Sequence, residues 1–530
     1  MRLLACSLVT LMVSSPAWAI FADHVTSFGP GVEGGAEIAA FDNQSQRLFV
    51  TNSDGNTIDV YNLSNVEQVQ TLPSIALSSF GDGPNSVAAH DGIVAVAVEA
   101  DPAQDPGVVV FFDATDGSFL SQVAVGALPD MLTFTPDGSR VLVANEGEPD
   151  DDYMVDPEGS ISIIDISSGV ASATVTEVGF ADFNVGQPRN NEVPAGLRIF
   201  GPGASVAQDL EPEYIAIDDT GTIAYVALQE NNGMAIVDIL AGNVMSLVDF
   251  GSKDHSLFGN ALDASNRDDA INIRNWPVRG FYQPDAIATL THNGEVYVLS
   301  ANEGDARDYD GFSEEFRIGD FALDPAAFPD AANLLLDENL GRLRTTDQNG
   351  DIDNDGDFDE LYSYGARSFS VWSGSTGQLL WDSGDEFERR TAQFGLPFFN
   401  VDDNRSDDKG PEPEGVDLVT VDGTPVAAIG LERTGGFFLY DMSNPTNPQI
   451  INYVPSLPSD TAPEGVLGVE AGANGESQPW LIVTHEDSGT IALYRLFSSQ
   501  AVPTLDYQAT LLFVLLLLAS AALVLRRRQP

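Results

Sequence analysis

The chain has 530 residues, of which 80 are aspartate or glutamate and 23 are lysine or arginine, so its formal net charge is −57. This excess of negative charge argues against nucleic acid and acidic membrane surfaces as partners, because both are bound through lysine and arginine. An acidic chain can instead be disordered, but 43% of the residues of this chain are hydrophobic, which is enough to build packed cores. Cations are therefore the expected partners.

An apolar leader opens the chain. Arg2 precedes an apolar stretch from Leu3 to Val13, and Ala17-Trp18-Ala19 fits a small-x-small cleavage site, so residues 1–19 are predicted to be a secretory signal peptide. The single cysteine, Cys6, lies inside this leader. A lipoprotein box around it is the alternative, which is disfavoured because too little apolar chain precedes it. The exported chain would contain no thiol, so disulfides and cysteine-ligated metals are not expected.

Residues 20–497 repeat a short unit of strand, turn, strand, loop and strand. Apolar strands alternate with turns such as Pro136-Asp137-Gly138, which is typical of antiparallel hairpins. The shortest units are 45 residues apart from Asn85 to Asp130 and 50 residues apart from Glu414 to Glu464. Four strands in a unit of this length are typical of a β-propeller blade.

Seven strands open with an acidic or amide residue, and seven strands close with one. The openers are Glu37, Asn85, Asp130, Glu213, Asp285, Glu414 and Glu464, and the closers are Asn52, Glu99, Glu146, Glu230, Glu303, Glu432 and Glu486. We therefore predict an all-β, seven-bladed β-propeller with loop insertions. The last unit lacks an outer strand after Tyr494, and Asp23–Phe28 is expected to supply it and close the ring. A pair of β-sandwiches or a β-helix is the alternative.

The openers and closers are expected to meet at one end of the propeller. Openers begin the innermost strands and closers end the antiparallel strands beside them, so both sets fall on the same rim. A ring of carboxylates repels itself unless cations are present. Calcium is favoured because hard oxygen ligands dominate and the chain has only five histidines. We predict a channel-mouth calcium site formed by Asp130, Glu146, Glu213, Glu230, Asp285, Glu303, Glu414, Glu432, Glu464 and Glu486. The alternative for each residue singly is a cap on a local turn.

A second metal-binding pattern lies between residues 345 and 360. Aspartates alternate from Asp351 to Asp355 and are followed by Gly356, as in the first half of an EF-hand loop, although position twelve is Tyr362. A solvated acidic loop is the alternative. We predict an inserted structural calcium loop whose ligands are Asp347, Asn349, Asp351, Asp353, Asp355, Asp357, Asp359 and Glu360.

No catalytic residue and no cofactor-binding residue is predicted. The sequence contains neither a His-Glu-x-x-His zinc motif nor a Gly-x-Ser-x-Gly nucleophile elbow. The glycines of Gly29–Gly34 have dinucleotide-binding spacing, but Pro30 and the lack of a following helix pattern argue against that function. The charged run from Arg405 to Glu414 could hold phosphate together with calcium, but a salt-bridged junction between blades is favoured.

Several segments resemble the choice-of-anchor I family: Asn145–Asp150, Asn302–Asp305, Gly365–Ser370, Asp382–Glu388, Arg405–Gly415, Gly430–Gly436 and Glu486–Thr490. The resemblance covers roughly residues 25–496, and Arg405–Gly415 is its most specific part. It implies a propeller body and a variable C-terminal anchor. The family includes bacterial surface proteins and is similar to mesenchyme-specific cell-surface glycoproteins linked to biomineralisation. Some bacterial relatives carry an alkaline-phosphatase label, which the motifs of this chain do not support independently.

The C-terminal end is predicted to anchor the protein. Val502-Pro503-Thr504-Leu505 resembles the sorting signals that begin Ile/Val-Pro-Thr-Leu, although the two following residues depart from the usual pattern. A simple membrane anchor and a buried core helix are the alternatives. The positive-inside rule places the terminal arginines in the cytoplasm and the propeller outside it, in the periplasm or at the cell surface. The predicted segments are a linker at 498–508, a transmembrane helix at 509–525 and a basic cytoplasmic tail at 526–530.

These patterns predict an exported, anchored, monomeric propeller that binds calcium and acts as an interaction or mineral-binding module. The expected partners are cations, a surface or mineral ligand, and a membrane through the C-terminal helix. One alternative is a calcium-dependent phosphoesterase in which carboxylates such as Glu146, Glu303 and Glu414 hold the ions. A second alternative is a structural envelope protein that calcium stabilises and that takes no ligand at the mouth.

Overall fold

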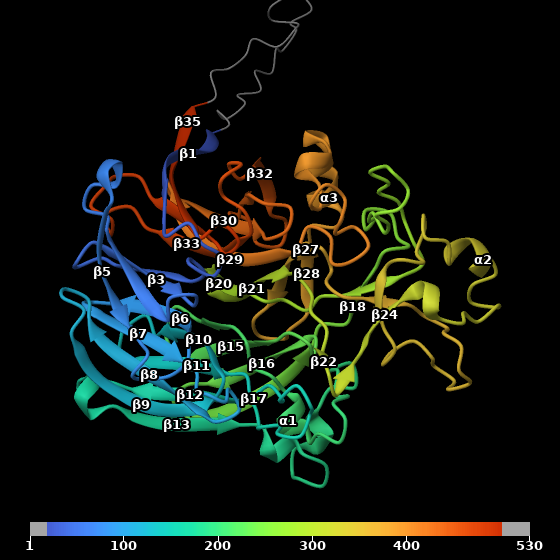
Figure 1. Cartoon of the computed structure of the whole chain (residues 1–530), viewed down its shortest axis with the longest axis horizontal. Helices are drawn as coiled ribbons and strands as arrows, with labels where there is room; N and C mark the ends of the chain where they lie inside the picture. Colours follow the sequence, from blue (N-terminus) through green and yellow to red (C-terminus); the bar gives the residue numbers. More distant parts are fainter. Residues whose placement is uncertain (1–17, 501–530) are drawn as a thin grey trace, which may run out of the picture. The chain divides into compact units, whose positions relative to one another are not determined.

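Seven four-stranded sheets dominate residues 18–500, which are the residues that this computed structural model describes. Their compact body spans Ala22–Leu496. Five of the seven sheets are built from consecutive strands of the chain, as hairpins joined by short turns predict. The expected all-β, propeller-like fold is confirmed (Figure 1).

The strands of the first four sheets, from the innermost outward, have these bounds: β2 (Ala39–Asp42), β3 (Arg47–Asn52), β4 (Thr57–Asn62) and β5 (Gln70–Ala76); β6 (Pro84–His90), β7 (Ile93–Val98), β8 (Pro106–Asp113) and β9 (Phe119–Ala127); β10 (Pro129–Phe134), β11 (Arg140–Asn145), β12 (Ser160–Asp165) and β13 (Thr174–Gly179); β14 (Ile215–Ile217), β15 (Ile223–Leu228), β16 (Gly233–Asp238) and β17 (Asn243–Asp249).

The other three sheets are, in the same order, β20 (Ile287–His292), β21 (Glu295–Asn302), β27 (Ser368–Ser373) and β28 (Leu379–Asp382); β29 (Pro413–Val421), β30 (Thr424–Leu431), β31 (Phe437–Asp441) and β32 (Gln449–Val454); and β33 (Pro463–Val469), β34 (Trp480–His485), β35 (Thr490–Gln500) and β1 (Trp18–Phe28). The expectation that a strand near the N-terminus completes the last sheet is therefore confirmed.

The seven innermost strands form a closed circle. Each contacts the next in the order β2, β6, β10, β14, β20, β29 and β33, and β33 contacts β2 in turn. The first sheets, drawn in blue, thus lie beside the last sheets, drawn in orange and red (Figure 1). This arrangement places the start of every innermost strand around one opening.

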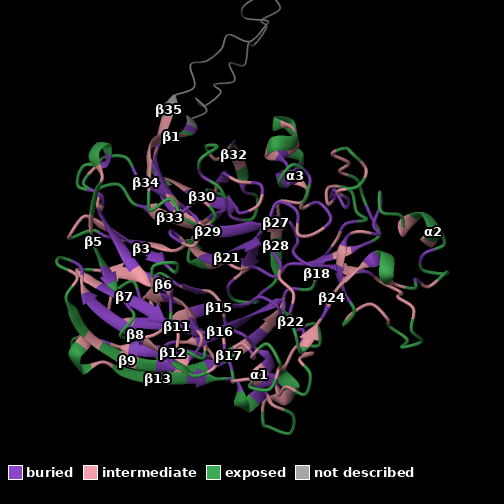
Figure 2. Cartoon of the chain, in the orientation of Figure 1, coloured by how far each residue is buried: buried purple, intermediate pink, exposed green. Residues whose placement is uncertain are grey.

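The core lies between the faces of neighbouring sheets. The middle strands are almost continuously apolar, as Ile-Val-Ala-Val-Ala-Val in β7 illustrates, because both of their faces are covered. Phe49 and Val96 pack in one cluster between the first two sheets, and Leu142 and Val226 pack in another between the next two. The outer strands β5, β9 and β13 expose much of their surface to solvent (Figure 2).

The longest insertions interrupt the sheet of β20, β21, β27 and β28 and the connections beside it. They carry a small core of their own, with Trp276, Leu340 and Leu343 buried together. The inserted elements are β18 (Ser252–Asp254), β19 (Arg279–Phe281), β22 (Asp308–Tyr309), β23 (Phe312–Ser313), β24 (Glu315–Arg317), β25 (Arg344–Thr346), β26 (Tyr362–Ser363), α1 (Val206–Asp209), α2 (Ala331–Leu334) and α3 (Glu386–Thr391). Insertion within a blade region, rather than an extra blade, is what the sequence predicts for residues 285–414.

No helix within residues 18–500 is long and apolar enough to cross a membrane. The predicted transmembrane helix at 509–525, the sorting-type motif and nearly all of the predicted signal peptide lie outside the described residues.

Candidate metal centre at the channel mouth

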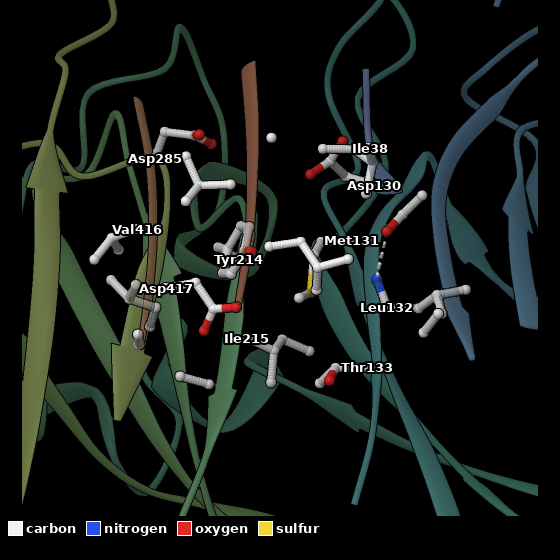
Figure 3. Close-up of a pocket in the computed structure, with 18 of the residues that line it drawn as sticks. Ile38, Asp130, Met131, Leu132, Thr133, Tyr214, Ile215, Asp285, Val416 and Asp417 are labelled. Carbon is white, nitrogen blue, oxygen red and sulfur yellow. Dashed lines mark hydrogen bonds between the residues drawn. The ribbon is translucent and has the colours of Figure 1, made fainter. Parts of the chain in front are cut away.

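A cavity of about 800 Å³ runs along the axis of the ring and is lined by residues from all seven innermost strands (Figure 3). Carboxylates gather at the end where these strands begin. Six residues predicted for the channel mouth line the cavity itself: Asp130, Glu213, Asp285, Glu303, Glu414 and Glu464.

The strand register explains why openers and closers meet. Pro413 pairs with Leu431, so Glu414 begins β29 beside the point where Glu432 follows β30. In the same way Pro463 pairs with His485, which brings Glu464 next to Glu486. Predicted residues that do not line the cavity, such as Glu146 and Glu230, still lie close enough to the lining carboxylates to repel them.

Burial raises the pKa of nearly every carboxyl in this mouth, and the neighbouring carboxylates raise it further. The pKa of Asp130 rises to about 8, that of Asp285 to about 6, and those of Glu230 and Glu432 to about 7. The pKa values of Glu146, Glu213, Glu303, Glu414 and Glu464 are also raised well above their usual value, with burial as the largest cause in each. The metal-free mouth therefore resists full ionisation at neutral pH.

Basic side chains neutralise only part of this ring. The Lys409 ammonium forms an ion pair with Glu303 and lies 3.5 Å from Asp305 and 3.6 Å from Glu412. Arg405 binds Glu412 at 2.6 Å and Asp408 at 3.0 Å. The charged run between residues 405 and 414 is thus a salt-bridged junction, as predicted from the sequence. The sequence did not predict that Lys409 reaches the cavity.

Several buried carboxylate oxygens at the mouth have no hydrogen-bond partner among the described residues: Glu213 Oε2, Glu230 Oε2 and Glu414 Oε2. Glu230 is 6% exposed and Glu414 is 8% exposed, so water reaches them poorly. Buried polar atoms in proteins are nearly always satisfied, and an orphaned carboxylate oxygen indicates a bound ion or water. These oxygens are therefore available to a cation or a water molecule at the mouth.

Two groups of three carboxylates bring their oxygens within 4.8 Å of one another in this mouth. The first is Glu303, Glu412 and Glu432, and two of its members, Glu303 and Glu412, already pair with the Lys409 ammonium. The second is Glu432, Glu464 and Glu486. Oxygens that all bind one calcium ion at 2.3–2.6 Å lie at most about 5 Å apart, so the second group fits such an ion. Within the described residues, one member of this second group forms an ion pair with a basic side chain: Glu432 pairs with Arg433 at 2.7 Å.

The predicted calcium loop is only partly convergent. The carboxylate oxygens of Asp351, Asp353 and Asp355 lie within 4.8 Å of one another, and the backbone N–H groups of Asp355 and Gly356 both donate to Asp351 at 3.1 Å. The charge of Asp355 raises the pKa of the exposed Asp353. Burial is the first cause of the raised pKa of Asp357, followed by the charge of Asp355.

The outer members of the predicted loop set bond to protein groups instead. Asn349 accepts a hydrogen bond from Arg198 at 3.2 Å, and Glu360 accepts one from the Tyr362 hydroxyl at 2.5 Å. Asp359 accepts from the backbone N–H of Ile352 at 2.9 Å, and Asp347 accepts from its neighbour Gln348 at 2.6 Å.

Fully buried ion pairs anchor the insertions next to the mouth. Arg307 forms ion pairs with Asp209 and with Glu211, the latter at 2.6 Å, and all three side chains are at most 2% exposed. Beside them, Tyr309 donates a hydrogen bond to Glu148 at 2.7 Å, and Arg198 donates to the backbone carbonyl of Glu230 at 2.8 Å. This network fixes the backbone that carries the acidic residues of the mouth.

The chain is similar to two curated proteins. It is 30% identical over 185 residues to Gigasin-3a of Magallana gigas, a match that covers 30% of this chain and 64% of that protein. It is 31% identical over 281 residues to the mesenchyme-specific cell surface glycoprotein of Strongylocentrotus purpuratus, covering 45% of this chain and 35% of that protein. The chain thus spans less than two thirds of the length of either relative.

Solved structures resemble the chain only distantly. The β-propeller domain of Cps50 (Swd1) from Myceliophthora thermophila is 9% identical, with a TM-score of 0.44, and the match covers 89% of this chain and 99% of that chain. Hydrazine synthase of Kuenenia stuttgartiensis is 12% identical, with a TM-score of 0.46, and the match covers 87% and 96%. The family model of the choice-of-anchor I domain matches residues 37–445, most of the chain, and the run Arg405–Gly415 lies inside that match. The chain belongs to the choice-of-anchor I family.

Proposed function

We propose that this chain is an exported, surface-located calcium-binding β-propeller that acts as an interaction or mineral-binding module through its channel mouth. The observation that carries the proposal is the convergence of Glu432, Glu464 and Glu486 in the mouth. Beside them, Glu414 has a buried oxygen that no described residue partners. A divalent cation there relieves the repulsion between carboxylates and satisfies their oxygens at the same time.

Calcium suits this mouth better than the common transition metals. The converging ligands are carboxylates, hard oxygen donors that transition metals such as zinc and copper do not prefer. Calcium also accepts six to eight oxygen ligands in flexible geometry, whereas magnesium demands a near-ideal octahedron. Water would supply the remaining ligands. A bound ion that keeps open positions toward the channel could also bridge to an anionic surface or mineral.

The exposed loop of Asp351, Asp353 and Asp355 supplies a second, structural calcium site in this proposal. Its two N–H bonds to Asp351 resemble the internal bonds of an EF-hand loop, and its position in an insertion separates it from the mouth.

The family and the predicted leader support a location outside the cytoplasm. The printed name of the sea-urchin relative describes a cell surface glycoprotein. The predicted signal peptide at 1–19 and the predicted membrane helix at 509–525 would export the body and hold it at the membrane or surface.

Glu464→Gln tests the mouth site directly. We expect isothermal titration calorimetry with CaCl₂ to show at least about a tenfold loss of affinity at one site, because a charged ligand is lost from a buried centre. The exposed Glu177 of β13 gives the matched control, and Glu177→Gln should bind calcium as the wild type does. Calcium uptake that remains in Glu464→Gln reports the Asp351 loop. Equal titrations for Glu464→Gln and wild type would refute the proposed centre.

A calcium-dependent phosphoesterase is the second candidate, because Lys409 lines the same cavity as the carboxylates and could bind a phosphate oxygen. Hydrolysis would form a bond from the water oxygen to phosphorus and break the ester P–O bond, and the proton lost by the water would pass to the leaving oxygen to give the alcohol. We expect no turnover of p-nitrophenyl phosphate with calcium, because Lys409 is already held by Glu303 and Glu412. Turnover that chelator abolishes and Glu303→Gln removes would establish the enzyme instead.

A further inference from the structure

The channel cavity extends well beyond the carboxylates of its mouth. Its volume is about 800 Å³, far more than one metal ion occupies. Figure 3 shows Asp130 and Asp285 at one level, near the mouth, and Asp417 at a deeper level. Several carboxylates line the cavity. Among the described lining residues, Asp417 is the only carboxylate that lies further along a strand than the second residue of that strand. The channel therefore has two levels of negative charge.

Asp417 is held in place by the backbone. Its carboxylate accepts hydrogen bonds from the N–H of Leu418 at 2.7 Å and of Gly468 at 2.8 Å. Burial raises its pKa to about 6, so it is mostly ionised at pH 8. Asp417 follows Glu414 by three residues on β29, so the two levels are about 10 Å apart along the strand at most.

The wall between the two levels is largely apolar. Met131 and Val416 line the channel there, and Tyr214 lies between Asp417 and the upper carboxylates (Figure 3). The negative charges of Asp417, Asp285 and Asp130 all raise the pKa of the Tyr214 hydroxyl, after the larger effect of burial. Its ring can also contact a cation through its π face.

The chain itself shows how this mouth holds an ammonium group. The Lys409 Nζ lies among Glu303, Asp305 and Glu412, with its aliphatic stem enclosed and the side chain 16% exposed. Glu414, which also lines the cavity, is 8% exposed and has one oxygen without a partner among the described residues. The mouth thus retains acceptor capacity for a further ammonium.

We propose that the channel binds a linear aliphatic diamine or polyamine, with one ammonium at the mouth beside Glu414 and Asp285 and another at Asp417. The methylene stem would lie against Met131 and Val416. Two charged ends with an apolar middle match two levels of carboxylate with an apolar wall between them, whereas a metal ion or a simple amine matches only one level. This inference does not depend on calcium binding at Glu432, Glu464 and Glu486.

Putrescine and n-butylamine are the probes, titrated calorimetrically into the calcium-free protein at pH 8 and low salt. Both have a four-carbon stem, but only putrescine carries a second ammonium. We expect putrescine to bind at least about tenfold more tightly, because it alone can pair with both levels. Equal affinity for the two amines would overturn the proposal. Spermidine should bind at least as tightly as putrescine, since it keeps the same spacing.

Asp417→Asn should lower the affinity for putrescine about tenfold and leave that for n-butylamine unchanged. Asp219→Asn, in the exposed turn between β14 and β15, is the control of equal charge and should change neither. If Asp417→Asn fails to fold, Met131→Lys decides, because its tethered ammonium would occupy the channel and abolish putrescine binding. The inference would be refuted if Asp417→Asn folds and binds putrescine as tightly as the wild type does. If only Met131→Lys folds, the same result for that variant would refute it.

The calcium titration of the same variants separates the two proposals. Asp417→Asn should bind calcium as the wild type does, whereas Glu464→Gln should not. If Glu464→Gln binds calcium as the wild type does while putrescine still binds more tightly than n-butylamine, only the metal centre is refuted. If Glu464→Gln loses calcium affinity but the two amines bind equally, only the amine channel is refuted.

Discussion

The calcium-free protein should be more stable at pH 5.5 than at pH 8, and calcium should remove this difference. In the folded protein the carboxyls of the mouth have pKa values raised to between about 6 and 8, or well above normal, whereas unfolded glutamate titrates near 4.3. Between pH 5 and pH 8 the folded state therefore binds more protons than the unfolded state. Its free energy of unfolding then falls as pH rises.

The size of the effect follows from the number of groups. A single carboxyl raised from 4.5 to about 7, such as Glu230, loses about 3 kcal/mol of stability across the window if it titrates alone. Neighbours share protons, so we expect several kcal/mol in total rather than a sum. Buried His255 and His485, whose pKa values burial lowers, act in the opposite direction, but they are two groups against nine carboxyls.

Calcium should act mainly at the high-pH end of this window. It binds carboxylates and competes with protons, so calcium at 100 times its Kd should add about 2.7 kcal/mol per site at pH 8. At pH 5.5 its effect should be much smaller, because protons already neutralise the mouth. Thermal melts with calcium and with EDTA at both pH values check this, and Glu432→Gln should weaken the pH dependence. A chelated protein that is more stable at pH 8 than at pH 5.5 would contradict the electrostatic account.

Arg307→Met should destabilise the protein by about 3–5 kcal/mol. The substitution keeps much of the side-chain volume but leaves Asp209 and Glu211 as unpaired charges in a site where all three side chains are at most 2% exposed. Arg390→Met is the matched control, because the Arg390 side chain is 46% exposed and its pair with Glu386 spans 3.3 Å. A surface pair of this kind is worth at most about 1 kcal/mol.

A compensating variant distinguishes lost pairing from lost packing. In Arg307→Met combined with Asp209→Asn and Glu211→Gln, the uncompensated charges are gone, so we expect much of the lost stability to return. Denaturation by guanidinium chloride measures all four proteins. If the triple variant is no more stable than Arg307→Met, the cost arises from packing around Phe200, over which the guanidinium lies at 4.7 Å.

The sequence predicts the ring and its acidic rim because both depend on local order. Strand periodicity and turns such as Pro136-Asp137-Gly138 give the hairpins, and antiparallel pairing then places an opener such as Glu464 beside a closer such as Glu486. No knowledge of distant contacts is needed for this step. The same reasoning anticipates that residues near the N-terminus complete the last sheet, because a blade lacking its outer strand needs one.

Contacts across long stretches of chain could not be predicted in this way. Asn349 has the composition of a metal ligand in its own segment, but Arg198, 151 residues away, takes its side-chain oxygen. Lys409 looks like one member of a local charged run, yet its ammonium reaches Glu303 from 106 residues away. Asp417 is hidden inside a strand that reads as apolar, and only the closed ring shows that it faces a channel.

The pairing of β1 with β35 makes the last sheet depend on both ends of the body. This sheet takes strands from both ends of the body, so it cannot be assembled until the last strand of the body has been synthesised. Until then the ring stays open beside β2, and a protease has access to its unpaired strands. Completion of this single sheet therefore distinguishes a body that has both its first and its last strand from one that lacks either.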